Sequence, residues 1–148
     1  MNDVGGITMI QLVVGKKGKG KTKIILDMVN KDVTAAKGNI VYLDKSMDHM
    51  YELNNKIRLI NVRDYGIENA DEFVGFIRGI VSQDHDLEQI YFDSFIKIAC
   101  LTDSQKIEEI VMKLDNMSNQ YGFKIVASVS LDESELPESL KSKVIVSL

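Results

Sequence analysis

The chain has 148 residues, of which 45% are hydrophobic and 27% charged, and its formal net charge at pH 7 is −4. This length and composition fit one globular domain with its own hydrophobic core. The acidic balance argues against a general binder of nucleic acid or of anionic membranes, because phosphate contacts need a basic surface. One cysteine, Cys100, cannot form an internal disulfide, which fits a reducing compartment. Since no apolar run is long enough to span a membrane, we expect a cytoplasmic protein without a membrane partner.

The first eight residues show no periodicity, so we expect a flexible tail at 1–8 and a single domain at 9–148. Six short apolar runs then predict buried strands. Most of them are apolar on both faces, as in a parallel sheet that is covered on both sides. The runs are 9–14, 40–44, 57–62, 89–93, 124–130 and 144–148.

Helical patterns alternate with these runs. The first opens at Lys21, and the second is an apolar stripe between Phe73 and Val81 that follows an N-cap candidate, Asn69. The third starts near 102–105 and ends at Gly122, a residue type common just after a helix. Alternating strands and helices predict an α/β fold, namely a three-layer α/β/α sandwich with a mostly parallel sheet.

The segment between the first strand and the first helix reads GKKGKGKT, residues 15–22. A lysine-rich stretch of this kind could be a basic patch for nucleic acid, a flexible linker or a cradle for phosphate. It matches the pattern G-x-x-x-x-G-K-[ST], and it lies between a strand and a helix, as that pattern requires. Glycines let backbone N–H groups turn toward a phosphate, and the helix N-terminus adds partial positive charge. The segment therefore predicts a phosphate cradle.

Two side chains of the cradle have predicted roles. Lys21 should reach the β- and γ-phosphates and be exposed when the site is empty, and the Thr22 hydroxyl should ligate Mg²⁺. The pattern does not require Lys16, Lys17 or Lys19, and these lysines either strengthen the local positive field or face solvent. With these included, the residues assigned to nucleotide binding are Gly15, Lys16, Lys17, Gly18, Lys19, Gly20, Lys21, Thr22 and Lys23.

A nucleotide site of this type also needs an apolar strand that ends in an aspartate, to hold Mg²⁺. The run QIYFD supplies Asp93, and IVYLD offers Asp44 as a competitor. Asp93 followed by Ser94 resembles the Asp-Ser of the RecA-like division of P-loop NTPases. That resemblance implies that strand 124–130 lies between strands 9–14 and 89–93. It also implies that the polar end of this strand, Ser128 and Ser130, falls where such proteins place a group that senses the γ-phosphate. We also expect 9–14 to be the central strand, flanked by 89–93 and 124–130.

The chain also resembles a group of small, uncharacterised bacterial P-loop proteins, some of them labelled twitching-motility ATPases after the pilus retraction motor. The motors themselves are similar only at the P-loop. Together the resemblances imply ATP and Mg²⁺ as cofactors. Lys21 and Asp93 are then the expected catalytic residues, with Asp44 and Ser128 as further candidates. The guanine-selecting pattern Asn-Lys-x-Asp is absent, which favours ATP over GTP.

One departure from the RecA-like pattern bears on hydrolysis. Those ATPases carry a water-activating glutamate after the strand that follows the P-loop helix, and here that position is Ser46, with Asp44 and Asp48 nearby. We therefore expect weak ATP hydrolysis, or hydrolysis stimulated by a homo-oligomer or protein partner that supplies an arginine. A nucleotide-responsive regulatory module and a small phosphotransferase remain as alternatives. His49 and His85 lack partners at metal-ligand spacing, so surface or structural roles are expected for both.

Overall fold

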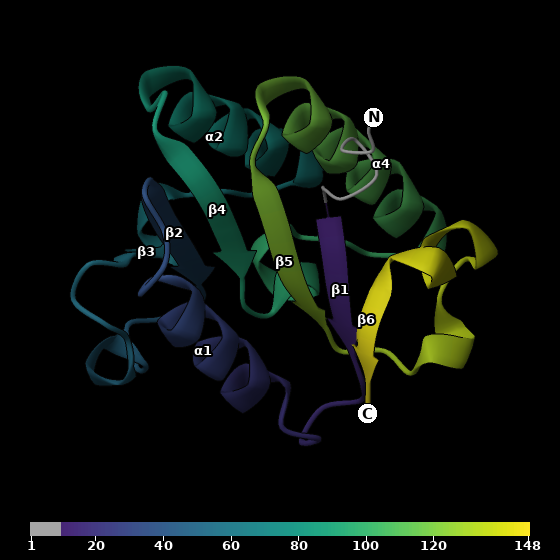
Figure 1. Cartoon of the computed structure of the whole chain (residues 1–148). Helices are drawn as coiled ribbons and strands as arrows, with labels where there is room; N and C mark the ends of the chain where they lie inside the picture. Colours follow the sequence, from purple (N-terminus) through teal and green to yellow (C-terminus); the bar gives the residue numbers. More distant parts are fainter. Residues whose placement is uncertain (1–9) are drawn as a thin grey trace, which may run out of the picture.

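The computed structural model describes residues 10–148, so the predicted tail, 1–8, and Met9 lie outside the described residues. A six-stranded, all-parallel sheet has the order β3-β2-β4-β5-β1-β6 (Figure 1). All six predicted runs form strands, with bounds within two residues of those expected. The strands are β1 (Ile10–Val14), β2 (Asn39–Asp44), β3 (Arg58–Asn61), β4 (Leu87–Phe92), β5 (Lys124–Val129) and β6 (Val144–Ser147).

Helices cover both faces of the sheet, which confirms the α/β sandwich. The predicted helices are α1 (Lys21–Asp32) on one face and α2 (Ala70–Gln83) and α4 (Ser104–Tyr121) on the other (Figure 1). The side chain of Asn69 accepts a hydrogen bond from the Glu72 backbone N–H, and α4 ends at Gly122 with φ 75°. Shorter segments were not predicted: α3 (Phe95–Ile98) and the 3₁₀ turns η2 (Met50–Glu52), η3 (Val62–Tyr65), η4 (Glu133–Glu135) and η5 (Glu138–Lys143).

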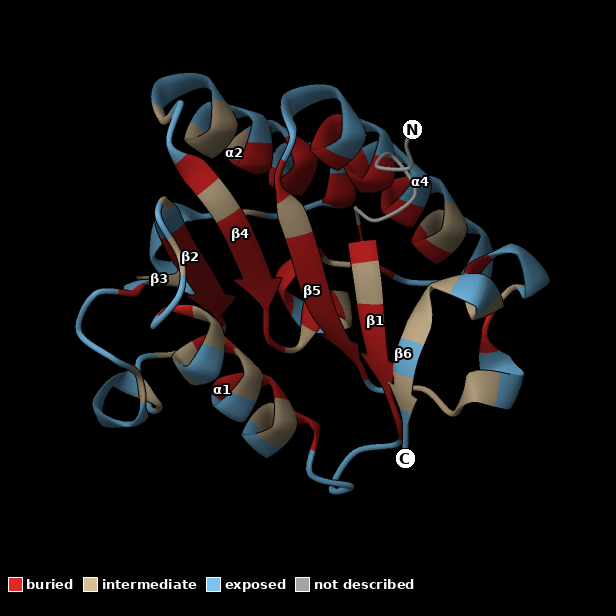
Figure 2. Ribbon diagram, in the orientation of Figure 1, coloured by how far each residue is buried: buried red, intermediate tan, exposed pale blue. Residues whose placement is uncertain are grey.

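The hydrophobic core has two parts, one on each face of the sheet. Under α2 and α4, the ring of Phe73 meets Phe92 edge-on at 5.3 Å, and Phe92 stacks on Phe95 at 5.4 Å. Under α1, the stacked rings of Tyr42 and Tyr91 lie 6.1 Å apart. Figure 2 shows the inner strands almost wholly buried, whereas β6 at the edge is partly exposed. Burial on both faces explains why the inner strands are apolar without alternation.

The position of β1 differs from the expectation. It pairs with β5 and β6, not with β4, so it is not a central strand flanked by the run 89–93. The reason is that β5 occupies the place between β1 and β4, in register with both, while the C-terminal strand covers the other side of β1. That β5 separates these two strands agrees with the expectation for 124–130. Because all strands are parallel, the segments that follow β1, β2, β4 and β5 meet at one edge of the sheet.

Within residues 10–148, no helix combines the length and the apolar character needed to cross a membrane.

Candidate functional site

The loop between β1 and α1, residues 15–20, is called the glycine loop below. Gly18 and Gly20 have φ angles of 87° and 96°, a region that residues with a Cβ rarely adopt. Gly20 is also the N-cap residue of α1, so the helix begins at Lys21 directly after the loop. The first-turn N–H groups of a helix have no partner within it and carry partial positive charge. The glycines therefore set the backbone path that leads into this N-terminus.

Lys21 is buried rather than exposed, which corrects the expectation for this side chain. It is 7% exposed, and its Nζ donates a hydrogen bond to the backbone carbonyl of Lys16 at 3.1 Å. The glycine loop folds around the side chain, and a backbone carbonyl of the loop accepts the hydrogen bond of the ammonium group. Burial lowers the pKa of Lys21, and the negative charge of Asp93 opposes that effect. The other lysines of this region, Lys16, Lys17, Lys19 and Lys23, are exposed.

Asp93 is the centre of a hydrogen-bond network at the carboxyl edge of the sheet. It follows β4, is 2% exposed, and its Oδ1 accepts hydrogen bonds from Thr22 Oγ1 at 3.1 Å and Ser128 Oγ at 3.0 Å. Its Oδ2 accepts a third hydrogen bond, from the Tyr42 hydroxyl at 2.9 Å. The Ser128 hydroxyl in turn accepts from the Ser94 backbone N–H. Three residues singled out in the sequence, Thr22, Asp93 and Ser128, are thus brought together.

Sequence reasoning missed Tyr42. It lies within β2 in a run that is apolar on both faces, and no pattern in the sequence distinguishes it from the neighbouring core residues. A buried tyrosine hydroxyl usually has a hydrogen-bond partner, and an aspartate at the end of the neighbouring strand can supply one. That rule could have drawn attention to Tyr42, but it could not have chosen between Asp44 and Asp93.

Asp44 ends β2 beside β4 and is 1% exposed. Its Oδ1 accepts a hydrogen bond from the Lys45 backbone N–H at 2.7 Å, but no group in the described residues hydrogen-bonds Oδ2. Burial and the nearby charge of Asp93 raise the pKa of the Asp44 carboxyl, against weaker opposing effects from the Lys45 N–H and from His49. Asp44 and Asp93 are therefore neighbouring carboxylates with different surroundings.

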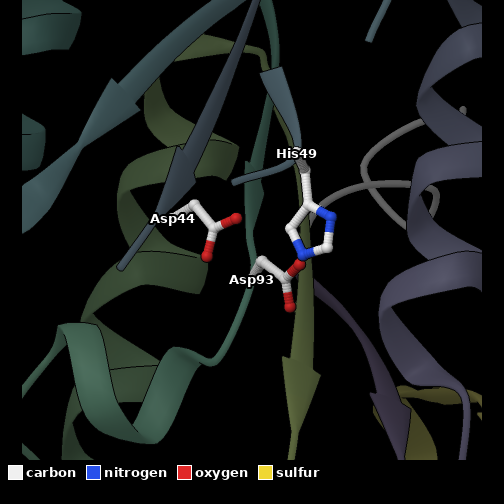
Figure 3. Close-up of side chains that lie close together, drawn as sticks. All are labelled: Asp44, His49 and Asp93. Atoms are coloured by element: carbon white, nitrogen blue, oxygen red, sulfur yellow. The ribbon is translucent and has the colours of Figure 1, made fainter. Parts of the chain in front are cut away.

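His49 lies near both carboxylates, a proximity that its spacing in the sequence did not predict. One ligand atom from each of Asp44, His49 and Asp93 lies within 4.8 Å of the others (Figure 3). The turn that carries His49 toward β2 and β4 was not visible in the sequence spacing. Burial by itself would lower the pKa of His49, but its hydrogen bond to Glu52 and the charges of Asp44 and Glu52 raise it overall.

Several other candidates do not join this group. Ser46 accepts only from the Asp48 backbone N–H, and Asp48 is exposed. Arg63 follows β3, and three strands separate β3 from β1, or roughly 19 Å at the usual strand spacing. Arg58 begins β3, at the opposite edge of the sheet from the glycine loop. Arg78 lies in α2, which covers the face of the sheet opposite to α1 (Figure 1). The described structure thus places no arginine of this chain beside the loop.

A hollow of about 350 Å³ borders the site, between α1 and η2. Thr22, Asn30, His49 and Glu52 contribute to its walls. Larger hollows of about 480 and 600 Å³ lie elsewhere, against α4 and between α2 and α4, and neither is lined by the glycine loop, Asp44, His49, Asp93 or Ser128. Of the site residues, Thr22 and His49 line the smaller hollow. Its open side could admit a ligand.

No model of a known protein family matches the chain, and no curated protein is significantly similar to it. The interpretation of the site therefore rests on its own geometry and on the sequence pattern.

Proposed function

We propose that the chain is a RecA-like P-loop protein that binds ATP together with Mg²⁺ and hydrolyses it weakly or only with a partner. One observation carries this proposal: the Thr22 hydroxyl donates to Asp93 across 3.1 Å, although the residues are 71 positions apart. The pair joins the end of the lysine-glycine pattern to the aspartate after an apolar strand. These are the two parts that a Mg-nucleotide site needs.

The glycine loop supports the phosphate part of the proposal. Its left-handed glycines lead directly into the N-terminus of α1, where backbone N–H groups favour an anion. The Lys21 ammonium already lies inside the loop, held by the Lys16 carbonyl. A phosphate would offer it a charged acceptor in place of a neutral one, and charge-assisted hydrogen bonds are the stronger kind. Phosphate binding would therefore draw on groups that the loop already gathers.

The hydroxyl of Thr22 and the carboxylate of Asp93 fit Mg²⁺, which prefers oxygen ligands and retains several waters. When bound, the ion would supply positive charge against the phosphate oxygens. Ser128 and Tyr42 orient Asp93 through hydrogen bonds to its two oxygens. Their contribution is to hold the carboxylate in one position and to keep it from turning.

The strand order supports the RecA-like type, since β5 lies between the strand before the loop and the strand before Asp93. Ser128, at the carboxyl end of β5, donates to Asp93, which fits a position close to the terminal phosphate. Two observations favour limited hydrolysis and keep a nucleotide-responsive regulatory module as the second candidate. Ser46 offers no carboxylate to activate water, and no arginine lies beside the loop in the described residues.

Calorimetry with ATP in the presence and absence of Mg²⁺ tests the proposal. Lys21→Ala should weaken Mg-ATP binding by at least tenfold, because it removes the ammonium from the loop interior. Lys31→Ala is the matched control: it removes an exposed lysine from the last turn of α1, at the end of the helix away from the glycine loop, and should change the affinity by less than threefold. Equal ATP affinity in the wild type and in Lys21→Ala would contradict the phosphate cradle.

A further inference from the structure

The side chains of Asp44, His49 and Asp93 form a cluster that nucleotide binding does not use in full. Mg²⁺ at a P-loop is held by oxygen atoms, whereas this cluster adds an imidazole nitrogen. We propose that Asp44, His49 and Asp93 form a binding site for a divalent transition-metal ion, and that this site shares Asp93 with the proposed Mg²⁺ site. The site binds this ion without nucleotide.

Asp44 provides the first independent indication of a cation. Its side chain is almost wholly buried, and its Oδ2 has no hydrogen-bond partner in residues 10–148. In Figure 3 the carboxylate of Asp44 is directed toward the space shared with Asp93 and His49. Protonation would remove the charge but would leave the Oδ2 hydroxyl without an acceptor, and an unsatisfied buried polar group is costly. A metal ion at Oδ2 removes both problems.

The charges around the cluster also favour a cation. Asp44 and Asp93 end neighbouring strands, and the Asp93 backbone N–H donates to the Leu43 carbonyl at 2.8 Å, which holds the two close. No salt bridge in the described residues neutralises either carboxylate, since Lys21 and Lys45 direct their ammonium groups at the Lys16 carbonyl and the Ser94 hydroxyl. Two adjacent buried carboxylates repel each other. A divalent ion between them would replace that repulsion with attraction.

Asp93 keeps a lone pair for such an ion. Its Oδ1 accepts two hydrogen bonds, from Thr22 and Ser128, but its Oδ2 accepts only one, from Tyr42. A carboxylate oxygen can accept about two. The Oδ2 atom can therefore accept the Tyr42 hydroxyl and ligate a metal at the same time, while Oδ1 remains committed to Thr22.

The orientation of His49 completes the argument. Its Nδ1 lies 3.0 Å from Glu52 Oε1, and Figure 3 shows the other ring nitrogen, Nε2, on the side of Asp93. A carboxylate that holds one ring N–H fixes the tautomer and leaves the opposite nitrogen free as a ligand. This is the usual arrangement around metal-bound histidines. Glu52 thus acts as a positioning residue for His49.

The ligand set indicates which ions should bind. One imidazole and two carboxylates suit Zn²⁺, Co²⁺, Mn²⁺ and Fe²⁺, and three protein ligands leave a position for water or another ligand. Mg²⁺ gains little from a nitrogen ligand and loses its waters reluctantly. The site should therefore prefer Co²⁺ and Zn²⁺ to Mg²⁺ by at least about a hundredfold.

The experiment uses the full chain without a histidine tag, stripped with a chelator and returned to chelator-free buffer without nucleotide. Titration with Co²⁺ should show one equivalent by calorimetry, together with visible absorption bands from an imidazole-containing coordination sphere, and Zn²⁺ should displace it. His49→Ala and Asp44→Asn should each weaken Co²⁺ binding by at least tenfold, and Glu52→Gln by about tenfold. His85→Ala, which removes the exposed second histidine of the chain, should leave Co²⁺ binding unchanged.

His49→Ala keeps the test decisive because His49 lies in a half-buried turn outside the core, so this variant should fold even if a substitution at Asp44 does not. It should also retain Mg-ATP binding, which separates this proposal from the proposed function. Co²⁺ binding no tighter than Mg²⁺ binding, Co²⁺ binding unaffected by His49→Ala, or Co²⁺ binding abolished by His85→Ala would each overturn the metal site. Failure of ATP binding alone would leave it standing.

Discussion

The hydroxyl of Tyr42 donates a hydrogen bond to Oδ2 of Asp93 across 2.9 Å, and both side chains are buried. Tyr42→Phe should therefore leave the carboxylate with one fewer donor where water has little access. We expect a loss of about 1–3 kcal/mol in the free energy of unfolding, measured by urea denaturation, because a charge-assisted buried hydrogen bond is removed.

Tyr91→Phe is the matched control for that substitution. Tyr91 stacks on Tyr42, but its hydroxyl lies 2.9 Å from Asp32 Oδ2 and 3.0 Å from Gln89 Oε1, and Lys124 also pairs with that Asp32 oxygen. Since Asp32 keeps the lysine, the loss should be below about 1 kcal/mol. Only Tyr42→Phe should weaken Mg²⁺-dependent ATP binding. Equal stability losses and unchanged ATP binding in both variants would remove Tyr42 from the Asp93 network.

Removing the charge of Asp93 should separate metal binding from nucleotide binding. Asp93→Asn keeps the shape of the side chain but lowers its affinity for Mg²⁺. With the cradle intact, metal-free ATP should bind the variant and the wild type within about threefold, whereas the enhancement by Mg²⁺ should fall by at least tenfold. Calorimetry with ATP, with and without a chelator, measures both quantities. An unchanged Mg²⁺ enhancement would place the ion elsewhere.

Asp115 joins the start of β1 to the segment before β6. Its Oδ1 accepts from the Ile10 backbone N–H at 3.1 Å, and its Oδ2 pairs with Lys143 Nζ at 3.1 Å. Asp115→Ala would leave a buried N–H and a largely covered ammonium unpaired, so we expect a loss of about 3 kcal/mol in unfolding free energy.

The control for Asp115→Ala is Asp71→Ala. Asp71 meets Lys106 and Lys113 only at 3.9 Å and is 75% exposed, so its loss should stay within about 0.5 kcal/mol.

The elements that the sequence predicted well are those with strong periodicity. The apolar runs located all six strands, and Asn69 and Gly122 marked helix ends correctly because capping depends on neighbours in the chain. The sheet order was predicted only in part. Apolar runs do not encode which strand lies beside which, so the neighbours of β1 depended on where β5 and β6 packed.

In the candidate site too, local sequence patterns predicted some features, whereas others depended on tertiary packing. The pattern at residues 15–22 and the strand end at Asp93 identified Thr22 and Asp93, and the structure brings them into contact. The burial of Lys21 depends on how the glycine loop closes, and the approach of His49 depends on the turn after β2. Neither has a periodic signal, since both arise from backbone paths in irregular segments. Tertiary contacts of this kind are outside the reach of spacing arguments.

The pKa of Asp44 predicts a pH-dependent stability difference in chelator-treated protein. Its folded-state pKa is raised by burial and by Asp93, so the charged form is less stable in the fold than in the unfolded chain. The contribution is thus most favourable below the unfolded pKa, about 3.9, and is lost as pH rises through the folded value. Asp44→Asn has no such titration. The variant should therefore gain stability relative to wild type as pH rises from 4 and keep a constant advantage above the folded pKa.

The advantage of Asp44→Asn should therefore be larger at pH 7 than at pH 4. Urea denaturation of both proteins at pH values between 4 and 8, with EDTA throughout, measures the difference directly. Glu68→Gln, a substitution of an exposed carboxylate just before α2, should show no comparable trend. A variant that becomes less stable than wild type as pH rises would mean that the Asp44 carboxylate is stabilised in the fold.

The purified chain should hydrolyse ATP slowly. Rapid turnover needs an oriented water and extra positive charge at the transition state, and a missing arginine finger alone can lower the rate by about 10³ or more. Ser46 has no carboxylate, and Asp48 is exposed. Asp44 is buried close to Asp93, where a raised pKa could suit a base, but its Oδ1 is held by the Lys45 N–H. Steady-state phosphate release under saturating Mg-ATP should therefore stay below about one turnover per minute. A rate of many turnovers per second that Lys21→Ala abolishes would show that the chain is a complete ATPase. If Asp44→Asn also abolished this turnover, Asp44 would be identified as the base, in place of the residue at position 46.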